Sequence, residues 1–140
     1  MKGVVFERMA ILRAAILYWA AIFALGFVLG TVRVLWGAEA MGEADIILIE
    51  VPVMLAASWL AARWVVRRFA VRSLSAAAAI GTFAFALLVC AELLLSTTLA
   101  GQSAGEWFAG LWRAPHRYGT LGQVGFGVMP VVAWLSAKAR

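Results

Sequence analysis

The chain has 140 residues, of which 65% are hydrophobic and 14% charged, and it carries a formal net charge of +5 with a mean hydropathy of +0.95. A water-soluble domain has about a quarter of its residues charged, so this composition excludes an ordinary soluble protein and predicts one integral membrane domain over residues 1–140. The single cysteine, Cys90, excludes a disulfide within the chain and a cysteine-based metal site, and its apolar neighbours predict a small buried side chain.

The first apolar segment covers residues 14–36 and is long enough to cross a bilayer, because a helix needs about 20 residues to do so. Gly26 and Gly30 are spaced as small residues that let helices approach closely, and Arg33 lies on their face. A cleavable signal peptide is the alternative for this segment. Its apolar run is longer than that of a signal, and Arg33 interrupts it, so we expect a retained span.

The second segment, residues 46–64, contains Glu50 and Pro52 within an otherwise apolar run, "IILIEVPVMLAASW". Helical spacing places Glu50 on one face with Met54, Ala57 and Ala61, which predicts that this face packs inward. A basic cluster follows, formed by Arg63, Arg67, Arg68 and Arg72. It is typical of a cytoplasmic loop, and binding of anionic lipid head groups is the alternative.

The third segment, residues 74–99, contains Glu92, and the loop after it contains a predicted short helix. Ser103 and Glu106 have the spacing of a capping box, in which each side chain hydrogen-bonds the other residue's backbone amide. Four apolar residues are expected to share one helical face, and Pro115 is expected to end the helix: Trp107, Phe108, Leu111 and Trp112. This pattern predicts an interfacial anchor, or alternatively a lid with Trp107, Trp112 and the only histidine, His116.

The fourth segment covers residues 119–136 and contributes Gln123, which aligns with Gly119, Gly127 and Pro130 on one helical face. Each span therefore has one strongly polar residue at a similar depth: Arg33, Glu50, Glu92 and Gln123. An isolated charge at the bilayer centre costs about 2.5–3.5 kcal/mol, so we expect these side chains to meet in a polar pocket. The alternative is that they only fix which helices are neighbours.

Charge placement predicts the orientation of the spans. Most of the twelve basic residues fall on one side, the N-terminal ones, the arginine cluster, Lys138 and Arg140. By the positive-inside rule, the chain is an all-α, up-down-up-down bundle of four transmembrane helices with both termini in the cytoplasm, and the short helix lies in the outer loop. Tryptophans prefer both membrane interfaces, and we expect all seven, Trp19 among them, near the ends of the spans. A bacterial inner membrane is the expected location.

Three functional hypotheses follow from the sequence. The first is an accessory or assembly subunit of a larger membrane complex, which the small size and glycine-rich faces favour. The second is a small oligomeric transporter or channel that uses the polar pocket. The third is a lipid-acting enzyme with a head-group pocket beneath Trp107 and Trp112.

The sequence contains no recognised catalytic or nucleotide-binding motif, and the excess of basic residues is explained by topology rather than by nucleic-acid binding. No catalytic, metal or cofactor site is therefore predicted. The expected partners are the lipid bilayer and other membrane-protein chains, either copies of this chain or different subunits.

Overall fold

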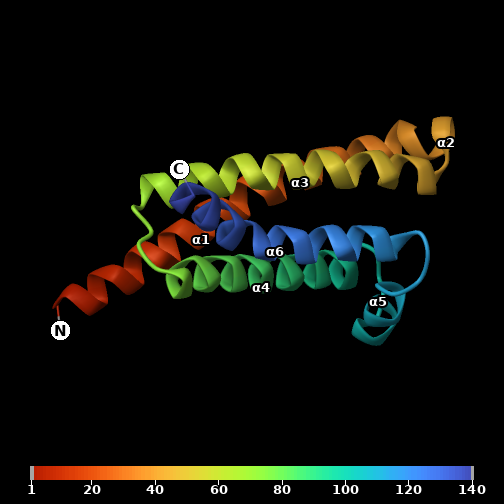
Figure 1. Ribbon diagram of the computed structural model, residues 1–140. Helices are drawn as coiled ribbons and strands as arrows, with labels where there is room; N and C mark the ends of the chain where they lie inside the picture. Colours follow the sequence, from red (N-terminus) through yellow and green to blue (C-terminus); the bar gives the residue numbers. More distant parts are fainter. Residues whose placement is uncertain (1, 140) are drawn as a thin grey trace.

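The computed structural model describes residues 2–139, and Figure 1 shows them as a set of long helices lying along one axis. In chain order the helices are α1 (Lys2–Val32), the π-helix η1 (Arg33–Gly37), α2 (Ala38–Met41), α3 (Glu43–Arg68), α4 (Leu74–Thr98), α5 (Ala104–Gly110) and α6 (His116–Lys138). Arg140, one of the basic residues assigned to the cytoplasmic side, lies outside the described residues, as does Met1.

Four helices within the described residues are long and apolar enough to cross a membrane: Val5–Met41, Glu43–Arg68, Leu74–Thr98 and His116–Lys138. The prediction of an all-helical chain with four segments long and apolar enough to span a membrane is therefore confirmed. Most of the helices are longer than the predicted apolar runs, because Glu, Lys and Arg are good helix formers and continue each helix beyond its apolar part. Helices α1, η1 and α2 follow one another without a break, and this continuous helical segment ends at Gly42. The φ of Gly42 is 87°, a conformation that glycine adopts readily, and this one residue connects α2 to α3.

The four long helices are not packed in chain order. Helix α1 packs against α3 and α4, and α6 also packs against α3 and α4, whereas α3 and α4 make little contact with each other. In Figure 1, α6 accordingly lies between α3 and α4, and successive long helices run in alternate directions. The chain thus begins α1 and ends α6 at one end of the molecule, called here the terminal end, and the opposite end is the α5 end.

Small residues allow a close approach of two backbones at the crossing of α4 and α6. A Cβ atom added to Gly81 would lie 2.0 Å from the carbonyl oxygen of Gly127, and one added to Gly127 would lie 3.3 Å from Cβ of Phe85. Any side chain at Gly81 would therefore push the two backbones apart. This contact involves Gly127, one of the glycines that the sequence assigned to helix packing.

Most of the buried residues gather toward the terminal end. They include Ala14, Ala15 and Tyr18 of α1, Ile80 and Ala84 of α4, and Phe126 and Ala133 of α6. The rings of Tyr18 and Phe126 stack with centroids 4.6 Å apart. The half of the molecule nearer the terminal end is therefore close-packed.

A kinked segment of α6 is held by a buried hydrogen bond from α1. Pro130 has no amide hydrogen, so the carbonyl of Phe126, four residues earlier, lacks its helical donor. The hydroxyl of Tyr18 donates to this carbonyl over 2.7 Å. The proline and the tyrosine are thus structurally linked, although they are far apart in the sequence.

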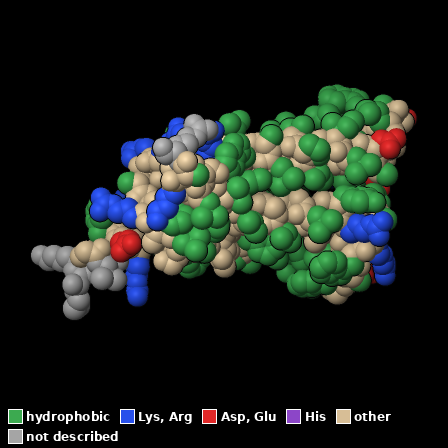
Figure 2. Space-filling model, in the orientation of Figure 1, with side chains coloured by type: hydrophobic (Ala, Val, Ile, Leu, Met, Phe, Trp, Pro, Cys, Tyr) green, Lys and Arg blue, Asp and Glu red, His purple; other side chains and the backbone are tan. Residues whose placement is uncertain are grey.

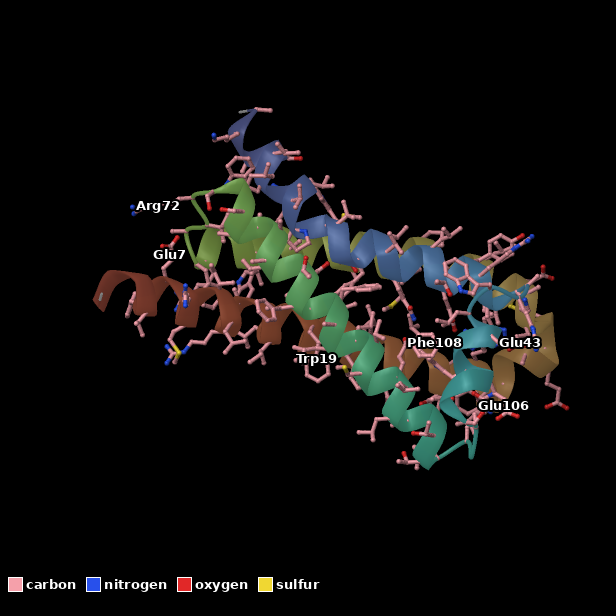
Figure 3. All side chains as sticks on the ribbon, turned by 90° about the horizontal axis from the view of Figure 1, so that it is seen from below. Glu7, Trp19, Glu43, Arg72, Glu106 and Phe108 are labelled. Carbon is pink, nitrogen blue, oxygen red and sulfur yellow. The ribbon has the colours of Figure 1, made fainter. Side chains whose placement is uncertain are left out.

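Charged side chains occupy the two ends of the face shown in Figure 2, with an apolar band between them. Figure 3 places Glu7 and Arg72 near the terminal end and Glu43 and Glu106 at the α5 end. Trp19 lies between these two ends of the molecule, and its place near a membrane interface stays a prediction. Cys90 is exposed on α4 and not buried as predicted, because its side of the helix faces away from the other helices.

The predicted capping box is present at the start of α5. The Ser103 hydroxyl accepts from the Glu106 amide over 3.2 Å, and the Glu106 carboxylate accepts from the Ser103 amide over 2.8 Å. The predicted end of this helix and its shared aromatic face are wrong. Helix α5 ends at Gly110, so Trp112 lies beyond it, and Pro115 instead precedes α6.

We expect α5 to loosen in acid. The Ser103 amide and hydroxyl hold the pKa of Glu106 below its usual value of 4.5. The cap therefore stabilises α5 above that value and is lost as the pH falls through the lower folded pKa. The fluorine NMR signal of Trp107, in protein labelled with 5-fluorotryptophan, should broaden over this acid range. Glu106→Gln should remove the transition, whereas Glu7→Gln at the other end should retain it.

Candidate binding cavity

A cavity of about 500 Å³ lies between the four long helices. Its walls are mostly apolar and include Phe23, Phe27, Leu88 and Phe126, together with side chains from α3. The four predicted polar residues line it as well: Arg33, Glu50, Glu92 and Gln123. The structure therefore brings together, around one space, the polar residues that each span contributes separately in the sequence.

Arg33 and Glu50 form an ion pair within this cavity. Nη1 of Arg33 donates to Oε2 of Glu50 over 2.8 Å, and the two side chains are 30% and 14% exposed. The second carboxylate oxygen, Oε1 of Glu50, is buried and has no hydrogen-bond partner among the described residues. One oxygen of this carboxylate is therefore bonded, and the other is buried without a bond.

Glu92 and Gln123 form the second polar pair. Nε2 of Gln123 donates to Oε2 of Glu92 over 2.6 Å, so α4 and α6 are joined here by a neutral amide. The guanidinium of Arg33 makes its direct bond with Glu50, so Glu92 is held by Gln123 alone among the side-chain hydrogen bonds of the described residues.

Irregular backbone on two helices positions the ion pair. Arg33 begins the π-helical turn η1. Such turns are rare in proteins as a whole, and those that occur are often found at functional sites. Pro52 lies two residues after Glu50 inside α3, where it removes one helical hydrogen bond. A Cβ atom on Gly37 would lie 1.9 Å from Cδ1 of Ile46, so the last residue of η1 allows α3 to approach closely.

The predicted packing residues divide into two groups. Gly26, Gly30 and Gly119 line the cavity, and a Cβ atom added to Gly30 would meet only the side chain of Arg33 from its own helix. The remaining members, Ala57, Ala61 and Gly127, pack against other helices. All three glycines of the first group leave space for the cavity. Gly26 also lies against Met54 of α3, whereas a Cβ atom on Gly119 would meet nothing within 4 Å.

Ser58 is a cavity residue that the sequence argument missed. Its side chain is 1% exposed, and its hydroxyl oxygen has no hydrogen-bond partner among the described residues. It lines the cavity on α3, eight residues after Glu50 and therefore on the same helical face. Continuing the spacing of Glu50 and Met54 by one more turn would have identified it.

The proposed lid residues do not line this cavity. Trp107 is buried, Trp112 is 74% exposed, and Nε2 of His116 lies 3.6 Å from Oε1 of Glu43 at the surface. The arginine cluster begins in the last turns of α3, toward the terminal end, with Arg63 over the ring of Trp59. These two sets of residues are therefore separate from the cavity.

The cavity combines apolar walls with a few polar groups, and this combination suits an amphipathic molecule. Ligand cavities in proteins are commonly about 300–1,000 Å³ and mostly apolar, with a small number of polar groups that orient the ligand. Among the described residues, no three His, Cys, Asp or Glu side chains are placed to hold a metal ion. Comparison of the chain with protein-family models, curated proteins and solved structures finds no match.

Proposed function

We propose that the protein is a small membrane carrier that binds an amphipathic solute in the cavity between its four long helices. The observation that carries this proposal is the convergence of Arg33, Glu50, Glu92 and Gln123 on one cavity of about 500 Å³. Polar residues that served only to fix helix neighbours would be expected to fill the space between the helices. Ionisable groups within membrane segments commonly mark solute pathways.

We infer the orientation of the carrier from its charges. The arginine cluster and Lys138 gather toward the terminal end, and the positive-inside rule supports a cytoplasmic location for this end and both termini, in a bacterial inner membrane. The four helices then form an up-down-up-down bundle whose cavity faces the outer leaflet, with α5 in the outer interface. Two or more copies of the chain would be needed to provide a continuous path across the membrane.

A cavity-filling substitution tests the proposal. Native mass spectrometry of the protein extracted from its own membranes should show a bound small molecule, and Gly30→Leu should lose it because the leucine side chain would enter the cavity. The matched control is Leu94→Phe, which adds bulk on an exposed side of α4. Equal retention by Gly30→Leu and Leu94→Phe, with both variants folded, would contradict binding in this cavity.

An accessory subunit is the second candidate function, and the N-terminal part of α1 favours it. This part extends beyond the other helices (Figure 1), and it exposes Val5 and Phe6, the latter at 78%. A partner chain could pack on this extension. In the same mass spectra, a different subunit retained with the protein would support this function. The lipid-acting enzyme gains no support, because neither Trp107 nor Trp112 lines the cavity.

A further inference from the structure

We propose that the cavity selects amphipathic amines, which place an alkylammonium head group beside Glu50 and Glu92 and an apolar chain between the phenylalanines. This inference rests on the proposed binding function and adds the chemical class of the solute. It follows from the balance of charges in the cavity, from the hydrogen-bonding groups that remain open and from the nature of the walls.

The charges in the cavity leave an excess of carboxyl groups. Arg33 is its only basic residue among the described ones, and it is already engaged with Glu50 at 2.8 Å. Glu92 is bonded by the neutral amide of Gln123. With both carboxyl groups ionised, the cavity therefore has a net charge of minus one. A monovalent cation neutralises this charge, whereas an anion adds a second buried negative charge.

The two carboxyl groups that line the cavity accept hydrogen bonds. Oε2 of Glu50 accepts from Arg33 and Oε2 of Glu92 accepts from Gln123, while Oε1 of Glu50 is buried without a partner among the described residues. A carboxylate accepts hydrogen bonds and cannot donate them, whereas an ammonium group donates three. A primary amine therefore offers these carboxyl groups donors that a sulfate or carboxylate head group lacks.

The walls fit the remainder of such a molecule. Phe23, Phe27 and Phe126 present aromatic rings, and Leu88 and Leu95 present aliphatic side chains. Aromatic rings also attract cations over their faces. An alkyl chain would replace water against these walls, while the ammonium group remains at the carboxylates.

Three probes with the same tail and different head groups test the inference: decylamine, decanol and decyl sulfate. The protein is placed in phosphatidylcholine nanodiscs, and the bound probe is counted by native mass spectrometry with empty nanodiscs as the blank. We expect decylamine to bind about 10- to 100-fold more tightly than decyl sulfate, the ratio that corresponds to one hydrogen bond with a charged group. Equal or tighter binding of decyl sulfate or decanol would overturn the inference.

Two variants make the charge argument sharper. Glu92→Gln retains the size of the side chain and should remove most of the preference for decylamine. The double variant Glu50→Gln/Glu92→Gln leaves Arg33 as the only charge and should reverse the preference toward decyl sulfate. The comparison of the three probes on the unchanged protein decides the inference even when a variant fails to fold.

The outcomes separate this inference from the proposed function. Saturable binding of decanol or decyl sulfate in preference to decylamine overturns the amine selectivity and leaves the cavity a binding site. Binding of none of the three probes removes the proposed function as well. Adding phosphatidylethanolamine to the nanodiscs then identifies the source of the amine: competition with decylamine indicates a lipid head group, and its absence indicates a free amphipathic amine.

Discussion

Arg33→Met is expected to lower the free energy of unfolding by about 2–4 kcal/mol, because it leaves Glu50 without its charged partner in a mostly buried position. Oε1 of Glu50 already lacks a hydrogen-bond partner, so the substitution would leave neither oxygen of this carboxylate with a bond among the described residues. The value lies somewhat below that of a fully buried pair because the Arg33 side chain is 30% exposed. Equilibrium unfolding in mixed micelles, followed by circular dichroism, measures it.

The double variant Arg33→Met/Glu50→Met is the control for this prediction. It removes both charges, and apolar replacement of a buried ion pair is often neutral. We therefore expect it to be more stable than Arg33→Met alone. The single variant Glu50→Met completes the comparison. If the stability lost by the double variant equals the sum of the losses in Arg33→Met and Glu50→Met, the two residues are independent and the 2.8 Å contact contributes nothing.

Tyr18→Phe is expected to destabilise the protein by about 1–3 kcal/mol, the usual cost of leaving a buried polar group without a partner. Phenylalanine retains the stacking on Phe126 but cannot donate to its carbonyl oxygen, which the tyrosine hydroxyl bonds over 2.7 Å. The same unfolding measurement applies. The cost should come from the hydrogen bond rather than from packing, because the two side chains have nearly the same shape.

Pro130→Ala provides the matched background for Tyr18→Phe. Alanine restores an amide hydrogen that can donate to the Phe126 carbonyl, so the tyrosine hydroxyl is no longer the only donor. In this background Tyr18→Phe should cost clearly less than in the unchanged protein. An equal cost in both backgrounds would contradict the structural link between the proline and the tyrosine.

Much of the fold could be predicted from the sequence because membrane spans follow from length and hydropathy. Helix ends were predicted less well. Residues 2–13 are too charged for a membrane span, yet they form the first part of α1 without interruption. The short helix illustrates the same difficulty. Its start depends on a local capping box and was predicted, but its end at Gly110 and the burial of Trp107 depend on contacts with the rest of the chain.

The polar residues of the cavity could be predicted because a charged residue in an apolar run is a strong signal. Their pairing could not be predicted, because helical spacing identifies a face but not the helix that this face meets. Arg33 bonds Glu50, and Glu92 bonds Gln123, because α3 packs against α1 and α6 packs against α4. A polar pocket was predicted, but its apolar walls and the part that Gly30 and Gly119 play in lining it were not, since these glycines have the same pattern whether they pack or leave space.

The placement of α6 has a consequence for biogenesis. During synthesis, α1, α3 and α4 enter the membrane first, and of these only α1 packs against both of the others. They therefore form an open arrangement until α6 arrives between α3 and α4, and only then does Glu92 acquire Gln123. Until that moment the carboxyl group of Glu92 lacks its bonding partner on α6. The chain is therefore expected to be least stable in the interval before its fourth long helix is complete.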